Sequence, residues 1–297
     1  MNTPEQVEAF QRIDSIFAPA YWRQMNTFYA KQSDPTKTRF VHYTSAEAAL
    51  KIIKQKRIWM RNVTAMSDYS EVQHGRRLYA KLLGNPVNAK PFIEALDRIS
   101  PGTAREAVGL FDSRWNDISF NTFITSVSEH DESEDVHGRL SMWRAFGGQT
   151  ARVALVFTVR RSLLNAGVLS LVFSPVAYLT EPELTQHFEE IVRGIDENSE
   201  FLRTIEGPTL RHIVFNALAN SVICLKHEGF KEEREWRLIY APARWKSDYI
   251  ETSTEVVAGI PQTVYKLPLD VSANAALSPF DLAQIFDRLI IGPTQYP

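Results

Sequence analysis

The segment Phe230–Tyr240 holds the residues best suited to chemistry, two glutamates and an arginine at alternate positions. Every second side chain of a β-strand shares a face, so a strand over residues 232–240 would project Glu233, Glu235 and Arg237 together. Two neighbouring carboxylates repel each other unless a bound cation or ligand offsets the repulsion, and the arginine can neutralise one of them. A surface strand with a salt bridge shows the same pattern, so the pair needs polar partners elsewhere to form a site.

Two other predicted strand ends supply such partners. His42-Tyr43-Thr44 stands where a strand meets the start of a helix, and backbone amides at that place favour bound phosphate or carboxylate groups. A second strand ends in hydroxyl side chains at Ser126 and Ser128. Each feature alone is common in structural roles, so their combination carries the functional hypothesis.

In this order, the three motifs resemble the three-part site of ADP-ribosyltransferases, which holds NAD in a cleft between split sheets. From about Arg39 to Pro293 the chain is also similar to a bacterial domain-of-unknown-function family distantly related to ADP-ribosyltransferases. The segments that carry the similarity are His42–Thr44, Met66–Glu71, Ser126–Ser128, Met142–Phe146, Phe230–Arg237 and Ile290–Pro293. The resemblance implies an α+β fold with an ADP-ribosyltransferase-like split β-sheet core and helical insertions.

The resemblance also implies NAD as the substrate. Glu235 would hydrogen-bond the nicotinamide ribose and place negative charge near the oxocarbenium-like state that forms as nicotinamide leaves, as in glycosidases. Glu233 would activate the acceptor nucleophile as general base, and no metal ion is required. His42 stands where an arginine usually accompanies the Ser-x-Ser and Glu-x-Glu motifs, so the site combines features of two subtypes.

Residues that would bind NAD follow from the same resemblance. These candidates are His42, Tyr43, Thr44, Ser126, Ser128, Tyr69 and Arg144. His42 would hold the adenosine ribose or a phosphate oxygen, and the hydroxyls would face the nicotinamide ribose. A tyrosine or Trp59 would stack on nicotinamide or adenine, and Arg144 would reach the pyrophosphate.

The implied function is an NAD-dependent ADP-ribosyltransferase or an NAD glycohydrolase. Its setting would be a toxin or phage-defence effector that acts on nucleic acid or protein and has a cognate antitoxin. One alternative is a metal-dependent nuclease that uses Asp68, Glu233 and Glu235 with Arg237 around a divalent ion. Another is a non-catalytic nucleotide-binding or nucleic-acid-binding module in which the acids are structural.

The composition is that of an ordinary globular protein, with 44% hydrophobic and 23% charged residues in a chain of 297. The 33 basic and 35 acidic residues give a net charge of -2, so the total charge does not support a general polyanion-coating role and leaves a local basic groove open. A single cysteine, Cys224, excludes an internal disulfide and a multi-cysteine zinc site. The first residues lack a secretion signal and the longest apolar run, Val168–Leu179, is too short to span a bilayer, so we expect a soluble cytoplasmic protein.

Residues 1–38 are expected to form a helical segment, and residues 39–297 a single ADP-ribosyltransferase-like domain with helical insertions near 84–116 and 183–225. Further helices are predicted at 45–55, 72–83 and 140–146. Strands are predicted at 39–43, 58–60, 118–127, 152–159, 168–178, 232–240, 263–267 and 288–291. In such proteins the last strand leads into a helical segment, so the end at Pro297 predicts a short member or a truncated chain.

An acidic run, Glu129–Asp135, places five carboxylates around His130. Its spacing does not match a calcium-binding EF-hand loop. A solvated loop is the expected structure, and its place between two candidate site elements leaves a gating role open.

Overall fold

The computed structural model describes residues 4–34, 38–65, 69–145, 151–160, 167–257, 259–272 and 274–293, without the side chains of residues 4, 69–71 and 145. The chain forms two compact units. The first comprises residues 1–26, 67–120 and 175–230, and the second comprises residues 27–66, 121–174 and 231–297. Both segments predicted as helical insertions fall within the first unit.

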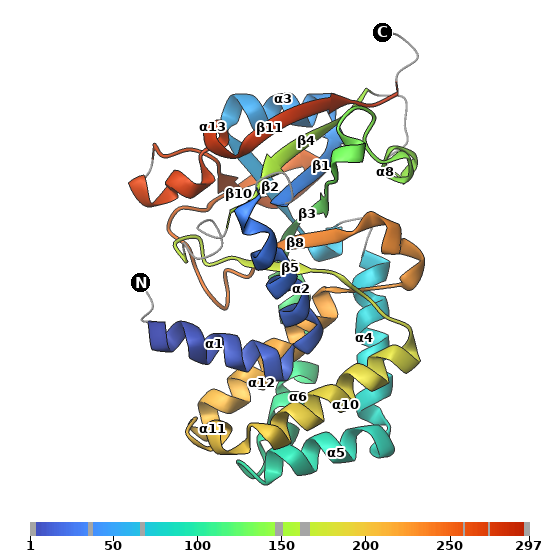
Figure 1. Ribbon diagram of the computed structural model, residues 1–297, viewed down its shortest axis with the longest axis vertical. Helices are drawn as coiled ribbons and strands as arrows, with labels where there is room; N and C mark the ends of the chain where they lie inside the picture. Colours follow the sequence, from blue (N-terminus) through green and yellow to red (C-terminus); the bar gives the residue numbers. More distant parts are fainter. Residues whose placement is uncertain are drawn as a thin grey trace. The chain divides into compact units, whose positions relative to one another are not determined.

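The second unit contains, within the described ranges, a nine-stranded open sheet (Figure 1). Its strands are β1 (Arg39–Ser45), β2 (Arg57–Asn62), β3 (Phe123–Glu129), β4 (Arg152–Thr158), β5 (Val172–Pro175), β8 (Glu235–Tyr240), β9 (Glu251–Val257), β10 (Ile260–Pro268) and β11 (Phe286–Ile291). The order is β11-β4-β1-β3-β2-β10-β9, and β8 pairs with β3 and β5. The sheet is antiparallel and occurs with grouped helices, so the predicted α+β class is confirmed.

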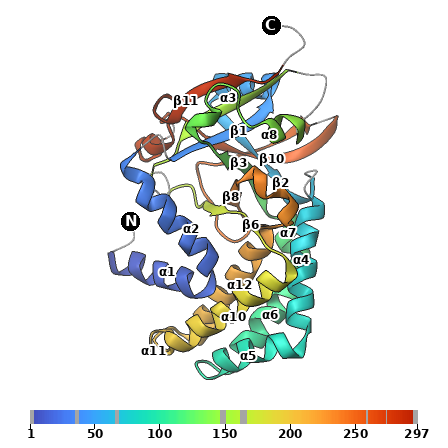
Figure 2. The ribbon, with the colours of Figure 1, turned by 45° about the vertical axis from the view of Figure 1, so that its right-hand side comes forward.

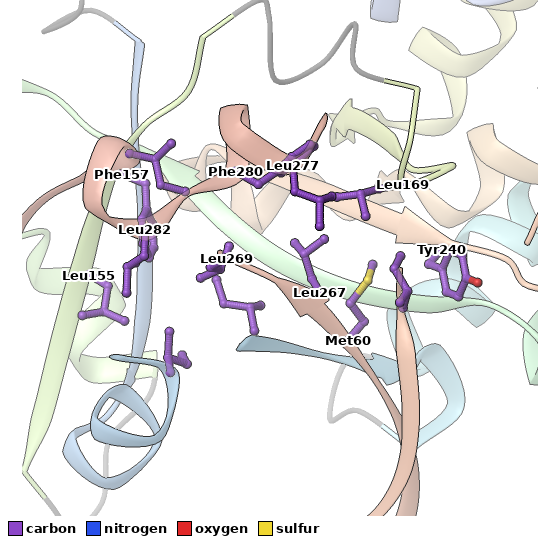
Figure 3. Packing of buried hydrophobic residues seen from close by; sticks show 14 of the residues in the cluster. Met60, Leu155, Phe157, Leu169, Tyr240, Leu267, Leu269, Leu277, Phe280 and Leu282 are labelled. Carbon is purple, nitrogen blue, oxygen red and sulfur yellow. The ribbon is translucent and has the colours of Figure 1, made fainter. Parts of the chain in front are cut away.

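The larger core of this unit lies on one face of the sheet. Its buried side chains come from α3 (Ala46–Gln55), from the strands, and from the η6 and α13 turns (Ala275–Phe280 and Leu282–Ile285). Figure 3 shows Leu155, Met60 and Tyr240 pointing into this cluster. The neighbours of Leu155 on β4 belong to a second cluster with α8 (Leu140–Ala145), which therefore covers the opposite face.

The predicted helix after the first strand is confirmed as α3. Its N-cap is Ser45, whose hydroxyl accepts a hydrogen bond from the backbone N–H of Ala48 at 3.2 Å. The helix therefore begins at Ala46, one residue after the predicted start at 45. Lys56, in the left-handed conformation with φ 50°, ends the helix and leads into β2.

The strand predicted at 118–127 is wrong in its first part. Residues Trp115–Phe120 form helix α7, and β3 begins only at Phe123. The run Ile118-Ser119-Phe120 is too short to distinguish a strand from one helical turn by its apolar pattern. The predicted strand at 168–178 is broken after Pro175 into β5 and the two-residue β6 (Ala177–Tyr178), because proline has no N–H to continue the ladder.

The first unit is mainly helical (Figure 2). Its elements are α1 (Pro4–Phe17), α4 (Tyr69–Gly84), α5 (Pro86–Asp97), α6 (Thr103–Ser113), α7, α10 (Glu181–Glu197), α11 (Ser199–Arg203), α12 (Gly207–Ile223) and the parallel pair β6–β7 (Leu225–Lys226). The residues of α2 (Pro19–Ala30) are divided between the two units. Helix α12 packs against α1, α4 and α6, so it lies at the centre of this core. Cys224, directly after it, is buried.

The indole of Trp143 fixes α8 to the sheet of the second unit. It packs edge-on against Tyr43 with ring centroids 4.8 Å apart, and its N–H donates to the carbonyl of His137 at 2.7 Å. Gly138 has φ 64°, and a Cβ there would lie 2.8 Å from the indole. The close approach of the ring and the left-handed backbone both require glycine at this position.

Replacement Gly138→Ala is therefore expected to lower the free energy of unfolding by about 2–4 kcal/mol, from backbone strain and overpacking together. Gly167→Ala is the matched control, because Gly167 also has a positive φ of 60° but has open space around its Cβ position. Its expected loss is about 1–2 kcal/mol. Urea unfolding of both variants measures the difference, and equal losses would show that the indole does not constrain Gly138.

Candidate functional site

Strand β3 lies at a split in the sheet. Because β8 pairs along one edge of β3, strands β1 and β2 must both use its other edge. Strand β1 meets that edge at Ser128 and Glu129, whereas β2 meets it at Phe123 and Ile124. The two strands therefore diverge on either side of Ser126.

The ring of His42 bridges this split. Its Nδ1 lies 2.9 Å from the main-chain oxygen of Ser126, and a carbonyl oxygen only accepts, so Nδ1 carries the proton. Burial lowers the pKa of His42 from its usual 6.5, although the bond to Ser126 acts in the opposite direction. The ring is thus neutral near pH 7 and keeps a lone pair on Nε2.

The lowered pKa of His42 predicts a pH dependence of stability. Below about pH 6.5 the unfolded chain binds a proton at this residue and the folded protein does not, so the free energy of unfolding falls as the pH falls towards the folded-state pKa. The loss is about 1.4 kcal/mol for each unit by which the pKa is lowered. His42→Gln keeps an N–H donor but does not titrate, so its unfolding free energy should fall less than that of the wild type between pH 7.5 and 5. The unfolding free energies are measured by urea denaturation at several pH values. An equal fall in both proteins between pH 7.5 and 5 would contradict the assignment.

The hydroxyl of Ser126 meets Glu235 on the neighbouring strand. The register sets Ser126 opposite Arg237 and Ser128 opposite Glu235, so these four side chains share one face. The Ser126 hydroxyl donates to Glu235 Oε1 at 2.5 Å. Arg237 donates from Nε to the same oxygen at 2.7 Å and from Nη2 to Oε2 at 3.2 Å.

The carboxylate of Glu235 is buried. Glu235 is 5% exposed and Arg237 is 0% exposed, so the ion pair is removed from bulk water. On the other face of β8, Trp236 packs against Phe40 and Phe173 with ring centroids 5.3 and 4.9 Å away. The aromatic packing fixes the strand, and the strand fixes the carboxylate.

Glu233 does not share the strand with Glu235, so the predicted strand over 232–240 is wrong at its start. Residues Glu228–Glu233 form the 3-10 turn η5, and β8 begins at Glu235. Arg234 between them has φ 44°, a left-handed conformation that interrupts the extended backbone. The alternation of side chains therefore holds for Glu235 and Arg237 but does not extend to Glu233.

The acidic run is not the solvated loop that its charge predicted, although Asp131 and Glu132 are exposed. Four arginines hold its carboxylates, and three of them, Arg39, Arg234 and Arg288, are distant in the sequence. The ion pairs join Arg39 to Asp135 at 2.8 Å, Arg288 to Asp135 at 2.7 Å, Arg139 to Glu134 at 2.8 Å, Arg234 to Glu134 at 3.0 Å, and Arg234 to Asp131. Burial raises the pKa of Asp135, but hydrogen bonds from His130 and Arg39 outweigh it and lower the pKa. The network keeps the loop charged and ordered near β8.

Arg139 was absent from the sequence predictions, although it contacts the first and third motif segments and the residue that directly follows the second, Glu129. Its backbone N–H donates to the Tyr43 hydroxyl at 2.8 Å, and its guanidinium reaches the main chain at Glu129 and Glu233. An arginine just after an acidic run was the available signal, but nothing in the pattern indicates which carbonyls it reaches.

The remaining predicted binding residues lie at separate places. Tyr43 is buried against Trp143, and Thr44 is half-buried on β1 opposite Val153. Ser128 is buried opposite Glu235. Arg144 is exposed on α8, whereas the side chain of Tyr69 lies outside the described residues.

Asp68, which the nuclease alternative requires, also lies outside the described residues. Within the described ranges, no group of three or more His, Cys, Asp or Glu side chains is placed to hold a metal ion. No helix in that part of the chain is long and apolar enough to cross a bilayer.

Residues 142–238 match a family model described as "Protein of unknown function (DUF2971)". The matched segment begins in α8, next to Trp143, and contains both Glu235 and Arg237 on β8. Searches of curated proteins and of solved structures found no match. The part of the predicted similarity that concerns a domain of unknown function is therefore confirmed for this segment.

Proposed function

We propose that the protein cleaves NAD as an ADP-ribosyltransferase or an NAD glycohydrolase, with Glu235 as the catalytic carboxylate. One observation carries the proposal: all three motifs meet at Ser126. His42 binds the carbonyl of Ser126, and the hydroxyl of the same residue binds Glu235. The site resembles the three-part arrangement of ADP-ribosyltransferases in residue types and order.

In the proposed reaction the bond between the nicotinamide nitrogen and ribose C1′ breaks, and nicotinamide leaves with the bonding electron pair. The ribose then carries developing positive charge, which a fixed carboxylate nearby stabilises. Water, or a hydroxyl or amine of an acceptor, attacks C1′ and gives up its proton. We assign that proton to Glu233, which lies on the turn just before Glu235.

Ser126 and Arg237 orient Glu235 in this scheme. Together they fix both carboxylate oxygens before a ribose arrives, which lowers the reorganisation needed during the reaction. Because Glu235 is only 5% exposed, the proposal includes an opening of the side chains around it when NAD binds. The acceptor would be water, protein or nucleic acid, and consumption of NAD would suit a toxin or phage-defence effector.

A second candidate function is a non-catalytic nucleotide-binding module. The observation that favours it is the two-point bond between Glu235 and Arg237, which neutralises the carboxylate internally. In this case NAD would bind without being consumed.

The test is incubation of the purified chain with NAD, with and without EDTA, followed by chromatography of the products. Our proposal predicts release of nicotinamide at the same rate in both samples. Binding of NAD without nicotinamide release would support the second candidate instead. Magnesium-dependent cleavage of nucleic acid that EDTA abolishes would support the nuclease alternative.

A further inference from the structure

We propose that Arg139 is a positioning residue for Glu235, a role that rests on the function proposed above. It does not contact Glu235 itself. Instead, it holds the backbone that leads into β8 and joins this backbone to strands β1 and β3. Its contacts with the turn before β8, with strands β1 and β3, and with Glu134 support this role.

The first contacts fix the turn before β8. Arg139 Nη1 donates to the carbonyls of Glu232 and Glu233 at 3.0 and 2.9 Å. These carbonyls belong to the last two residues of the η5 turn. The next residue, Arg234, has the left-handed φ of 44°, so the chain changes direction immediately after the two held carbonyls. The direction of this turn decides where Glu235 begins the strand.

The second set of contacts reaches β1 and β3. Arg139 Nη2 donates to the carbonyl of Glu129 at 2.7 Å, at the end of β3. Its backbone N–H donates to the hydroxyl of Tyr43, which neighbours His42 on β1. One residue therefore links the three chain segments that the proposed site requires.

Glu134 orients the guanidinium itself. Its carboxylate oxygens accept from Arg139 Nε at 2.8 Å and Nη2 at 3.1 Å, and the arginine side chain is 10% exposed. All three guanidinium nitrogens are thus bonded. A planar fork can serve a carboxylate and three separate carbonyls at once, whereas a lysine ammonium is a point donor on a flexible stem. Lysine at this position would keep the charge but lose part of the geometry.

The test compares Arg139→Lys with Arg288→Lys. Arg288 is the matched control because it pairs with the same acidic loop, at Asp135, but among the described residues it does not bond the carbonyls before β8. In Arg139→Lys we expect kcat for nicotinamide release to fall about 100-fold, since a displacement of about 1 Å at the reacting group has effects of this size. KM for NAD should change little, and Arg288→Lys should match the wild type. Glu134→Gln, which frees the guanidinium on one side, should lower kcat in the same direction by a smaller factor.

Hydrogen exchange followed by mass spectrometry tests the positioning independently of NAD chemistry. Faster exchange confined to residues 228–236 in Arg139→Lys supports the positioning of this segment by Arg139. This result stands even if the wild type releases no nicotinamide and the proposed function fails. Wild-type exchange in this segment overturns the proposal. So does faster exchange throughout β1–β4, which would indicate a general loss of stability. An active wild type with an equally active Arg139→Lys overturns the positioning role and leaves the proposed function intact.

Discussion

Glu235→Gln is expected to lower the rate of nicotinamide release by about 100- to 1,000-fold, the range measured when one preorganised electrostatic group is removed from a transition state. The amide has nearly the shape of the carboxylate and can still accept a hydrogen bond from Ser126. It carries no charge, so it cannot stabilise the positive ribose. The loss should therefore appear in kcat, with KM for NAD little changed.

Two variants control this result. Glu251→Gln makes the same chemical change on β9 of the same sheet, outside the proposed site, and should keep wild-type activity. Ser126→Ala removes a group that orients Glu235 and keeps the charge, so its effect should be smaller, about tenfold. Equal nicotinamide release by the wild type and Glu235→Gln would remove Glu235 from the mechanism.

Arg237→Leu is expected to lower the free energy of unfolding by about 3–5 kcal/mol. Arg237 is fully buried and bonds both oxygens of Glu235, so its removal leaves a buried carboxylate without its cation. The hydrogen bond from the Ser126 hydroxyl does not compensate for the desolvation of a charge. Urea unfolding with an unchanged m-value measures the loss.

The double variant Glu235→Leu/Arg237→Met distinguishes the effect of an unpaired buried charge from the effect of lost packing. Removal of both charges together eliminates the desolvation cost, so the double variant should be close to the wild type in stability or above it. It should still lack nicotinamide release. A double variant as unstable as Arg237→Leu would show that packing, and not the unpaired charge, dominates at this position.

Local patterns in the sequence were sufficient for the elements around the split. The apolar runs of β1 and β4 and the capped amphipathic helix α3 follow from residues close together in the chain. The proximity of the three motifs was also expected, although only through the resemblance to ADP-ribosyltransferases. Strand β9 was missed because its residues are mostly exposed on both faces, so no hydrophobic alternation marks it.

Features that depend on distant residues were not predictable. The acidic run reads as a solvated loop because its partners Arg39, Arg234 and Arg288 lie far away in the sequence. The left-handed backbone at Arg234 has no local signal either, because arginine rarely adopts it. Contacts of its guanidinium with Asp131 and Glu134 help to stabilise this conformation, and the separation of Glu233 from the strand follows from it.

A crystal structure of the Glu235→Gln variant with bound NAD would test the central claim most directly. We predict that the side chain at position 235 lies within about 3 Å of a hydroxyl of the nicotinamide ribose, with Ser126 still bonded to it. We also predict that His42 borders the same ligand. NAD bound away from β8, with the side chain at position 235 still enclosed by Ser126 and Arg237, would contradict the assignment of Glu235 as the catalytic carboxylate.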